Sequence, residues 1–592
     1  MSDRQRDVFA AIGAVAVVIT SVRAINWLIT RPNSFSELAR STVGATLAAA
    51  RSVPAVAAAI DAALDASLNN LRDEIAPITP DALHAIPTLG RGADNVAAAL
   101  RTTVSHDATQ SGLARGSAFG GIYHVLPASK EDSTDTASAQ HAMHSEVSRA
   151  FLDTNLLYPG MFKTARRMEA EAVEMAVALL RDGADGVGGG FAAIEACGLL
   201  TSGGTESVLL AIKAHRDAAL NALGFKDDDT KNQIPPIIAA ARAGHVLKII
   251  AGVSVHPAFD KAAALFGLQL IKLPLDAKTL QVSPIAIANA LDSSAILIVA
   301  SAPGFAHGVI DDIVGICHVA ETFHLSSAWG KQGIPVHVDN CLGGIHLSFA
   351  ANLNSPRFDF RTSNAVSSIS MDLHKYGGAP KGSSVIAFRS RLRRRYAYSA
   401  TTDFPGGLYT TPTLAGSRGG VNAALAWSTL VSTGANGFTR SAQCVTAAHK
   451  KIILGISEIP GLVLLGDPHA CVVAFTTTSQ SPFSIYSVAA RMAATSAHWK
   501  VALLQSPPGA HVVLTERFSQ PWEGGGSTSS WTVCDQWLSD LRACTLAATH
   551  APHDPLYEGK GDAGIYGAAG ALPAGEISEI LKRYCDVLTV VQ

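Results

Sequence analysis

Charged residues and cysteines are both scarce in this 592-residue sequence. Only 16% of the residues are Asp, Glu, Lys or Arg, and the formal net charge is −2. Because proteins bind nucleic acid through a concentrated positive surface, this balance excludes nucleic acid as the main partner. One short basic run is the exception, and it is typical of a solvated face or an anion-contacting edge: Arg391, Arg393, Arg394 and Arg395.

The eight cysteines never occur at the Cys-x-x-Cys spacing of a zinc site, and they are too thinly spread for a disulfide framework. This pattern predicts no metal site and indicates a reducing compartment. Apolar residues, by contrast, make up 48% of the chain, which is enough for a large buried core. Length and composition therefore predict a large folded domain with smaller additions.

One long uncharged run stands near the start of the chain. Val8–Val22 follows Arg4 and Arg6 and is closed by Arg23. A membrane-spanning helix needs about 20 apolar residues, and continuing past Arg23 supplies that length if the arginine reaches the interface. We therefore predict a transmembrane anchor at residues 1–31. A signal segment and a buried amphipathic helix remain alternatives, although no convincing small-x-small cleavage site follows.

The rest of the chain divides by pattern into three parts. Residues 32–150 begin alanine-rich with helical spacing and are predicted to be a helical segment. Residues 151–415 alternate β-rich and helical stretches, which predicts a large α/β domain with parallel strands, and residues 416–592 are predicted to be a smaller α+β domain. Strands are predicted at 247–255, 295–299, 335–338, 367–370, 462–465 and 472–477, and helices at 285–291 and 313–323.

Chemically useful side chains stand where predicted strands end, which is where open parallel sheets collect ligands. Residues 201–207 (TSGGTES) precede a helical run, so their N–H groups favour an anion, although a simple helix cap has the same pattern. His256 follows a predicted strand, and its ring is suited either to a structural role or to stacking on a flat heteroaromatic group.

Two further strand ends carry an aspartate and a lysine. Asp339 closes one strand, where a carboxylate either caps the next turn or keeps a heteroaromatic ring nitrogen protonated. Lys375 follows His374 after another strand, and a lysine in a desolvated, electropositive pocket is able to react with an aldehyde. A single lysine is a weak indication. The order of anion loop, stacking histidine, aspartate and His-Lys is a much stronger one.

These residues resemble the group II decarboxylase superfamily that uses pyridoxal 5′-phosphate (PLP), and within it the sphingosine-1-phosphate lyases. The similar stretches span most of residues 117–420 and are NLLYPGMFKTARRMEAE (155–171), TSGGTES (201–207), VSVHPAFDKAA (253–263), SAPGFAHGVID (301–311), HVDNCLGG (337–344), FDFR (358–361), SMDLHKYGGAPKGSS (370–384) and GGLYTTPTLAGSR (406–418). The resemblance implies a fold-type I PLP-dependent transferase-like large domain, and an active homodimer whose sites are completed across the interface.

The resemblance also assigns roles to individual residues. It implies that Lys375 holds PLP as a Schiff base, that Asp339 pairs with the pyridine nitrogen, and that His256 stacks on the ring. His374 is expected beside the cofactor, where it would both contact PLP and take part in catalysis. The cofactor phosphate is expected at the residues of the anion loop, which are Gly203, Gly204 and Thr205.

Further implied residues concern the substrate. Lys381 and Tyr123 are expected to take part in catalysis, and Lys381 is alternatively suited to bind the substrate phosphate. Asn155 and Tyr158 are expected near that phosphate. Tyr158 stands where the lyases carry a histidine, so it can donate one hydrogen bond but cannot carry a positive charge. Two more departures from the family pattern are Gly378 and Gly419, and together these changes put substrate choice in question.

The implied reaction is a retro-aldol cleavage of a sphingoid base 1-phosphate to a long-chain aldehyde and ethanolamine phosphate. An amino-acid decarboxylase of the same superfamily and a catalytically silent membrane-tethered scaffold are the alternatives. In a eukaryote, the expected location is the endoplasmic reticulum membrane, with the catalytic domain in the cytosol. Lys375 and Asp339 are both present, which argues against the silent scaffold.

Overall fold

The computed structural model describes residues 136–184, 195–225, 234–350, 357–521, 532–554 and 556–557, with isolated positions at 54, 58, 62, 578, 581, 582 and 585. The predicted anchor at 1–31, most of the predicted helical segment at 32–150 and Tyr123 lie outside these ranges. Within the described ranges, no helix combines the length and apolar character that crossing a membrane requires. The predicted anchor and the domain boundaries therefore stay predictions.

A seven-stranded sheet forms the centre of the larger part of the molecule, with strand order β1-β7-β6-β5-β4-β2-β3. The run from β6 to β3 is parallel, whereas β7 pairs antiparallel with both β6 and β1. The strands are β1 (Cys197–Thr201), β2 (Lys248–Gly252), β3 (Gln269–Leu273), β4 (Ala295–Ser301), β5 (Val336–Asp339), β6 (Val366–Asp372) and β7 (Ser384–Phe388). This α/β sheet confirms the predicted fold class for the large domain.

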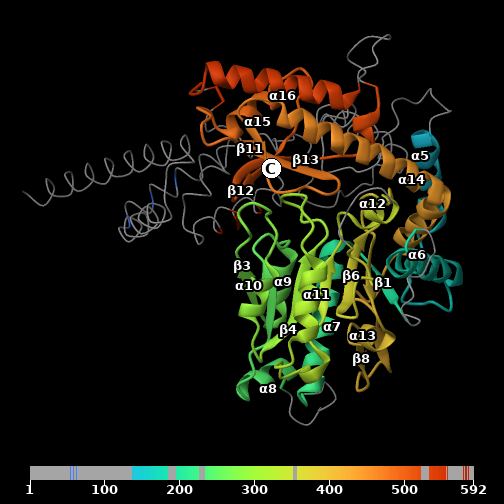
Figure 1. Cartoon of the computed structure of the whole chain (residues 1–592). Helices are drawn as coiled ribbons and strands as arrows, with labels where there is room; N and C mark the ends of the chain where they lie inside the picture. The colour runs from blue at the N-terminus through green and yellow to red at the C-terminus, as the bar shows by residue number, and fades with distance from the viewer. Residues whose placement is uncertain are drawn as a thin grey trace, which may run out of the picture.

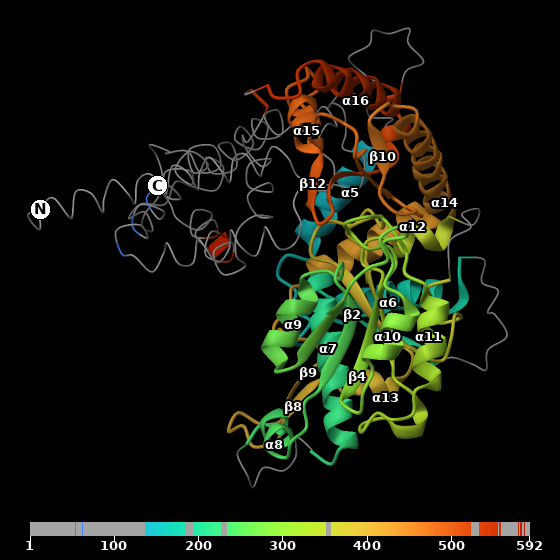
Figure 2. The ribbon, with the colours of Figure 1, turned by 60° about the vertical axis from the view of Figure 1, so that its left-hand side comes forward.

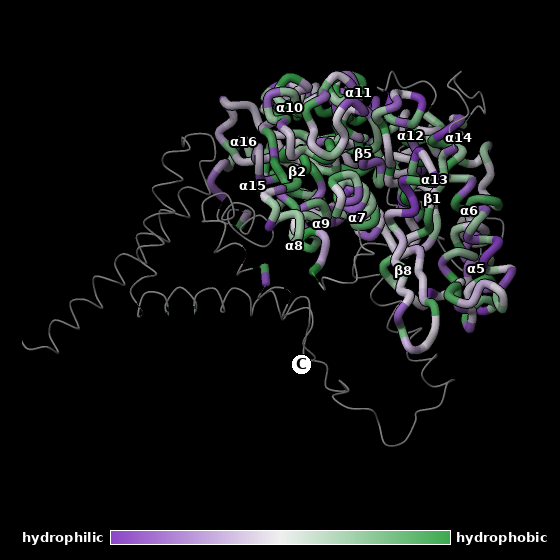
Figure 3. Tube along the Cα trace, turned by 90° about the horizontal axis from the view of Figure 1, so that it is seen from below, coloured by the Kyte–Doolittle hydropathy of each residue, from purple (hydrophilic) through white to green (hydrophobic). Residues whose placement is uncertain are grey.

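Helices cover both faces of this sheet, which is why its inner strands are buried along nearly their whole length. Every residue of β4 is buried. Figures 2 and 3 place β2 between α10 and α11 on one side and α7 and α9 on the other. The covering helices are α7 (Gly204–Ala222), α9 (Ala258–Phe266), α10 (Pro284–Ala290) and α11 (Ile313–Thr322), and α8 (Pro236–Arg242) packs against α7.

A smaller antiparallel sheet of order β10-β11-β13-β12 lies above the large sheet in Figure 1. Its strands are β10 (Leu462–Leu464), β11 (Val472–Thr477), β12 (Ala502–Gln505) and β13 (Pro508–Val513). Three helices accompany it, namely α14 (Val421–Ser457), α15 (Ile485–Ala493) and α16 (Val533–His550). The mixed architecture predicted after residue 416 is present, and the six predicted strands and two predicted helices all overlap observed elements.

The remaining elements flank the two sheets. Helices α5 (Thr136–Ala150) and α6 (Lys163–Asp182) both contact α14, and α6 also packs on β1. The short elements are η1 (Gly330–Gln332), α12 (Gly344–Phe349), α13 (Arg391–Arg395), β8 (Ser399–Thr401), β9 (Tyr409–Thr411) and η2 (Glu516–Ser519). One hydrophobic cluster runs from the large sheet into the smaller one, so the two sheets share a core.

Buried histidines make the stability of this core depend on pH. Burial lowers the pKa of His307, His337 and His449 to about 4, and that of His346 to about 3. Neighbouring histidines add to the lowering at His307, His346 and His449, whereas Asp339 opposes it at His337. In the unfolded chain each would titrate near pH 6.5. Above that pH the histidines are neutral in both the folded and the unfolded chain. Below it they bind protons in the unfolded chain but stay neutral in the folded chain.

We therefore expect the free energy of unfolding to fall as the pH drops from about 6.5 to about 4, by about 1 kcal/mol per histidine per pH unit. Urea unfolding at a series of pH values measures this slope. The variant His346→Gln should have a shallower slope than the parent protein. Equal slopes in the two proteins would contradict the assignment.

Candidate active site

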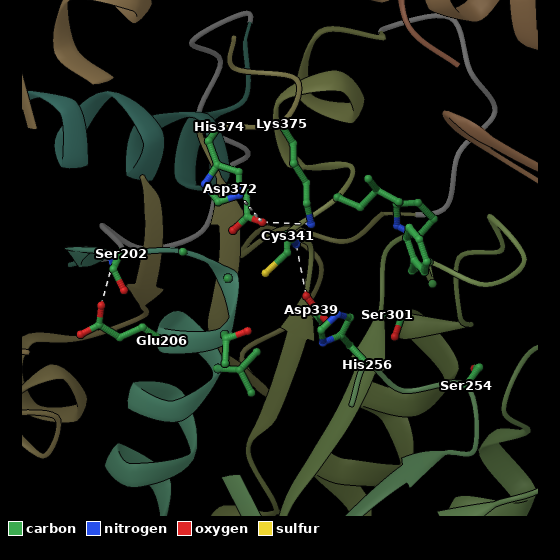
Figure 4. A pocket seen from close by; sticks show the side chains of 18 residues that line it. Ser202, Glu206, Ser254, His256, Ser301, Asp339, Cys341, Asp372, His374 and Lys375 are labelled. Carbon is green, nitrogen blue, oxygen red and sulfur yellow. Dashed lines mark hydrogen bonds and ion pairs between the residues drawn. The ribbon is translucent and has the colours of Figure 1, made fainter. Parts of the chain in front are cut away.

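A cavity of about 450 Å³ opens at the carboxyl ends of the parallel strands. Its walls come from five segments, each of which follows a strand of the large sheet. Figure 4 shows their side chains converging on one space. The lining residues are Ser202–Glu206, Val208, Ser254, His256, Ser301, Pro303–Phe305, Asp339, Cys341, Leu342, Asp372, His374 and Lys375.

Lys375 enters the cavity from the turn that follows β6. Its Nζ lies 2.9 Å from Asp372 Oδ2, and the Asp372 side chain is only 2% exposed. His374 Nε2 lies 3.5 Å from the same carboxylate oxygen. The amine is therefore held at the cavity wall beside a buried negative charge (Figure 4).

Asp339 lies at the end of β5 and is 9% exposed. Burial by itself would raise the pKa of this carboxyl. The electrostatic influence of His256, His337 and Lys375 and the hydrogen bond from Cys341 N together hold the pKa below its usual range. Its Oδ1 accepts hydrogen bonds from Cys341 N at 3.2 Å and from Ser370 Oγ at 3.1 Å. The cavity thus has a fixed, ionised carboxylate at the end of a central strand.

The N-terminus of α7 forms another wall of the cavity. No side chain caps this helix end, so its first N–H groups remain suited to an anion. A Cβ on Gly204 would lie 2.9 Å from both Asp372 Oδ1 and Cys341 Sγ, so only glycine permits this close approach. The loop is also held by Ser202 N, which donates to Glu206 Oε2 at 2.7 Å.

His256 lies in the loop between β2 and α9, and its ring lines the cavity. Its Nδ1 accepts a hydrogen bond from Ala258 N at 3.1 Å, which fixes the ring at the start of α9. An exposed ring in this position is available to stack on a flat ligand.

Two basic residues near Lys375 have altered acidity. Burial lowers the pKa of His374, which Asp372 partly offsets, so the ring favours its neutral form. Burial, and after it the charge of Lys375, lower the pKa of Lys381, whereas Asp372 partly offsets this lowering. Lys381 does not line the cavity, yet it interacts electrostatically with both groups at its wall.

The two residues expected at a substrate phosphate lie elsewhere in this chain. Asn155 pairs with Gly419, and its Oδ1 accepts from Leu157 N at 3.0 Å and from Arg418 N at 3.3 Å. Tyr158 is 57% exposed. Neither lines the cavity, and Tyr123 lies outside the described residues. Their roles stay predictions.

The cavity also contains residues that the sequence reading did not single out, namely Ser254, Ser301, Phe305, Cys341 and Asp372. Ser301 ends β4, so the rule that ligands gather at strand ends would have found it. Asp372 ends β6, three residues before Lys375, and the same rule applies. Phe305 and Cys341 also follow strand ends, but neither side chain carries a charge that would mark a ligand site in the sequence.

Comparisons with known proteins agree with this geometry. The model of the pyridoxal-dependent decarboxylase conserved domain matches residues 158–482. Sphingosine-1-phosphate lyase of Oryza sativa subsp. japonica is 34% identical over 75% of this chain and 73% of that protein. The Arabidopsis thaliana lyase is 34% identical over 74% of this chain and 71% of that protein.

Solved structures give the same result. The sphingosine-1-phosphate lyase of Burkholderia pseudomallei K96243 matches with a TM-score of 0.68 at 29% identity, over 86% of this chain and 98% of that one. Glutamate decarboxylase of Lactobacillus brevis matches with a TM-score of 0.59 at 15% identity, over 80% of this chain and 96% of that one, and shows the fold alone.

The fold and the site together define a PLP-dependent enzyme of the pyridoxal-dependent decarboxylase family. Within that family, the chain belongs to the sphingosine-1-phosphate lyases.

The residues of the cavity fit PLP. The uncapped start of α7 suits its phosphate, and the ionised Asp339 suits its ring nitrogen. Lys375 supplies an amine for its aldehyde, and His256 a ring to stack on its face. Among the described residues, no group of three His, Cys, Asp or Glu side chains is arranged to hold a metal ion.

Proposed function

We propose that this protein cleaves sphingoid base 1-phosphates between C2 and C3, releasing a long-chain aldehyde and ethanolamine phosphate. The observation that carries the proposal is the identity of 30–34% to sphingosine-1-phosphate lyases from plants, animals and yeast. The cavity supplies the residue types that such a reaction needs. Asp339 ends β5, and Lys375 lies in the turn that follows the adjacent parallel strand β6.

When bound, PLP supplies an electron sink for the electron pair left on C2 as the C2–C3 bond breaks. Lys375 Nζ would hold PLP through its aldehyde. Asp372, 2.9 Å from Nζ, would stabilise the protonated form of this amine when it is free. Asp339 would keep the ring nitrogen protonated, because its carboxylate stays ionised.

The cleavage also needs a base for the C3 hydroxyl proton. Lys381 is suited to this step, because burial and the charge of Lys375 lower its pKa and make the neutral amine more accessible. The alternative role of Lys381, binding the substrate phosphate, would instead use its charged form. A pH profile of kcat/KM separates the two roles, since a base gives activity that rises with pH.

The direct test incubates the purified protein and PLP with dihydrosphingosine 1-phosphate and measures long-chain aldehyde and ethanolamine phosphate. Parallel reactions with glutamate and with aromatic amino acids measure carbon dioxide. We expect aldehyde in the first reaction and no carbon dioxide in the others. Carbon dioxide without aldehyde would replace the proposal by an amino-acid decarboxylase, and a PLP-bound protein inactive in all reactions would support a scaffold.

We further propose that residues 1–31 anchor the protein in a membrane, which in a eukaryote is the endoplasmic reticulum with the catalytic domain in the cytosol. The uncharged run Val8–Val22 and the lipid nature of the substrate support this proposal. Deleting residues 1–31 should move the protein from the membrane pellet to the soluble fraction. The resemblance also supports a homodimer with shared sites, for which light scattering should give twice the mass of one chain.

A further inference from the structure

Tyr376, the residue after Lys375, connects the turn that follows β6 to the smaller sheet. Its side chain is 6% exposed, and its hydroxyl donates to the Leu514 carbonyl oxygen at 2.6 Å. Leu514 directly follows β13, and its own N–H donates to the Cys471 carbonyl at 2.7 Å. The hydroxyl also interacts with the Cys471 thiol. The position of Lys375 is therefore tied to a segment far along the chain.

The wall of the cavity formed by residues 303–305 is also held by β13. Residues 303–305 line the cavity, and His511 on β13 donates from Nδ1 to the Ala306 carbonyl at 2.9 Å. The His511 ring also packs edge-on against Phe305, with centroids 4.9 Å apart. Burial lowers the pKa of His511, so the ring stays neutral and keeps this packing.

A third contact fixes that wall from the neighbouring strand β11. Gly308 approaches Val472 so closely that a Cβ on the glycine would overlap the Val472 carbonyl oxygen. His469 N donates to the Gly308 carbonyl at 3.1 Å. The loop after β4 is thus fixed to the two inner strands of the smaller sheet, β11 and β13.

We infer that β13 holds two walls of the PLP cavity at a fixed separation. Tyr376 and His511 are then positioning residues for the bound cofactor. Leu514 and His511 stand three positions apart on one segment, so a single strand end sets the separation between the Lys375 turn and the Phe305 wall. Neither residue lines the cavity. The smaller sheet then acts on PLP through these two contacts, without touching it.

The test uses the variant Tyr376→Phe, which removes the hydroxyl and leaves the ring. A matched control exists in Tyr486→Phe, because Tyr486 is also 6% exposed and its hydroxyl also donates to a leucine carbonyl, that of Leu504, at 2.6 Å. Both changes remove a buried hydrogen bond to the smaller sheet. Only the bond of Tyr376 connects that sheet to the turn that carries Lys375.

We expect Tyr376→Phe to raise the dissociation constant of PLP about tenfold, the equivalent of one such hydrogen bond. The pH at which the absorbance of bound PLP changes should also move by about half a unit or more, because the setting of Lys375 beside Asp372 is loosened. Tyr486→Phe should leave both quantities within about twofold and a few tenths of a pH unit of the parent.

A second pair of variants tests the contact between His511 and Ala306. His511→Leu removes the donor to Ala306 and should weaken PLP binding, whereas His511→Asn places an amide N–H near the Nδ1 position and should restore much of it. Parent-like PLP binding and absorbance in both Tyr376→Phe and His511→Leu would overturn the inference, as would an equal effect of Tyr486→Phe. All measurements are made without substrate, so failure of the proposed lyase reaction is a separate result.

Discussion

Replacing Lys375 by alanine is expected to give a folded protein without cofactor colour and without activity. The side chain supplies the only amine among the residues that line the cavity, so no other lining residue can replace its covalent bond to PLP. Turnover should fall by a factor on the order of 10⁴ or more, as for the loss of a nucleophile on which the reaction depends. Absorbance spectra before and after borohydride reduction, followed by peptide mass spectrometry, measure this outcome.

The control for this experiment is Lys272→Ala. Lys272 lies on β3 at the sheet edge, where its Nζ pairs with Asp260 Oδ1 at 2.6 Å, outside the cavity lining. This variant should keep the colour and the adduct at Lys375. A pyridoxyl adduct found on another lysine of the parent protein would overturn the assignment of the cofactor site and of the residues around it.

Replacing Asp339 by asparagine is expected to leave PLP bound but to reduce turnover about 10²- to 10⁴-fold. The amide has nearly the same shape and can still accept hydrogen bonds from Cys341 N and Ser370 Oγ. It has no charge, however, so it cannot hold a proton on the ring nitrogen, and the electron sink is weakened. Stopped assays of aldehyde release, together with the absorbance of bound PLP, measure the two effects separately.

A matched control is Asp312→Asn. Asp312 caps α11 by accepting from Gly315 N, and it does not line the cavity. This variant should keep nearly all of its stability, because asparagine caps a helix about as well as aspartate does, and it should have a parent-like kcat. Parent-like turnover in Asp339→Asn would show that another group controls the ring nitrogen.

The central sheet was predictable because its strands carry a strong local signal. Runs such as 295–299 are apolar at every position, which in an alternating pattern of helices and strands indicates a strand buried on both faces. The observed β4 is buried throughout. The antiparallel placement of β7 between β1 and β6 was not predicted, because nothing local in the sequence of a strand specifies its neighbour or its direction.

The candidate site was predictable to the extent that its residues sit at strand ends. Asp339, Lys375 and the loop before α7 all follow strands, and one edge of the sheet brings them together. Asp372 was missed as a partner of Lys375, because two charges three residues apart meet only if the turn between them folds back. Asn155 and Tyr158 were expected near the substrate phosphate, but neither lines the cavity.

The sequence by itself determined which chemical groups are present and in what order, from the glycine loop to the lysine, because short-range patterns of residue type specify strands, helices and their ends. The tertiary structure decided how those groups are held. The contact from Tyr376 to Leu514 joins residues 138 positions apart, and that from His511 to Ala306 joins residues 205 apart. Such contacts depend on the packing of one sheet against another, which no local pattern of residues encodes.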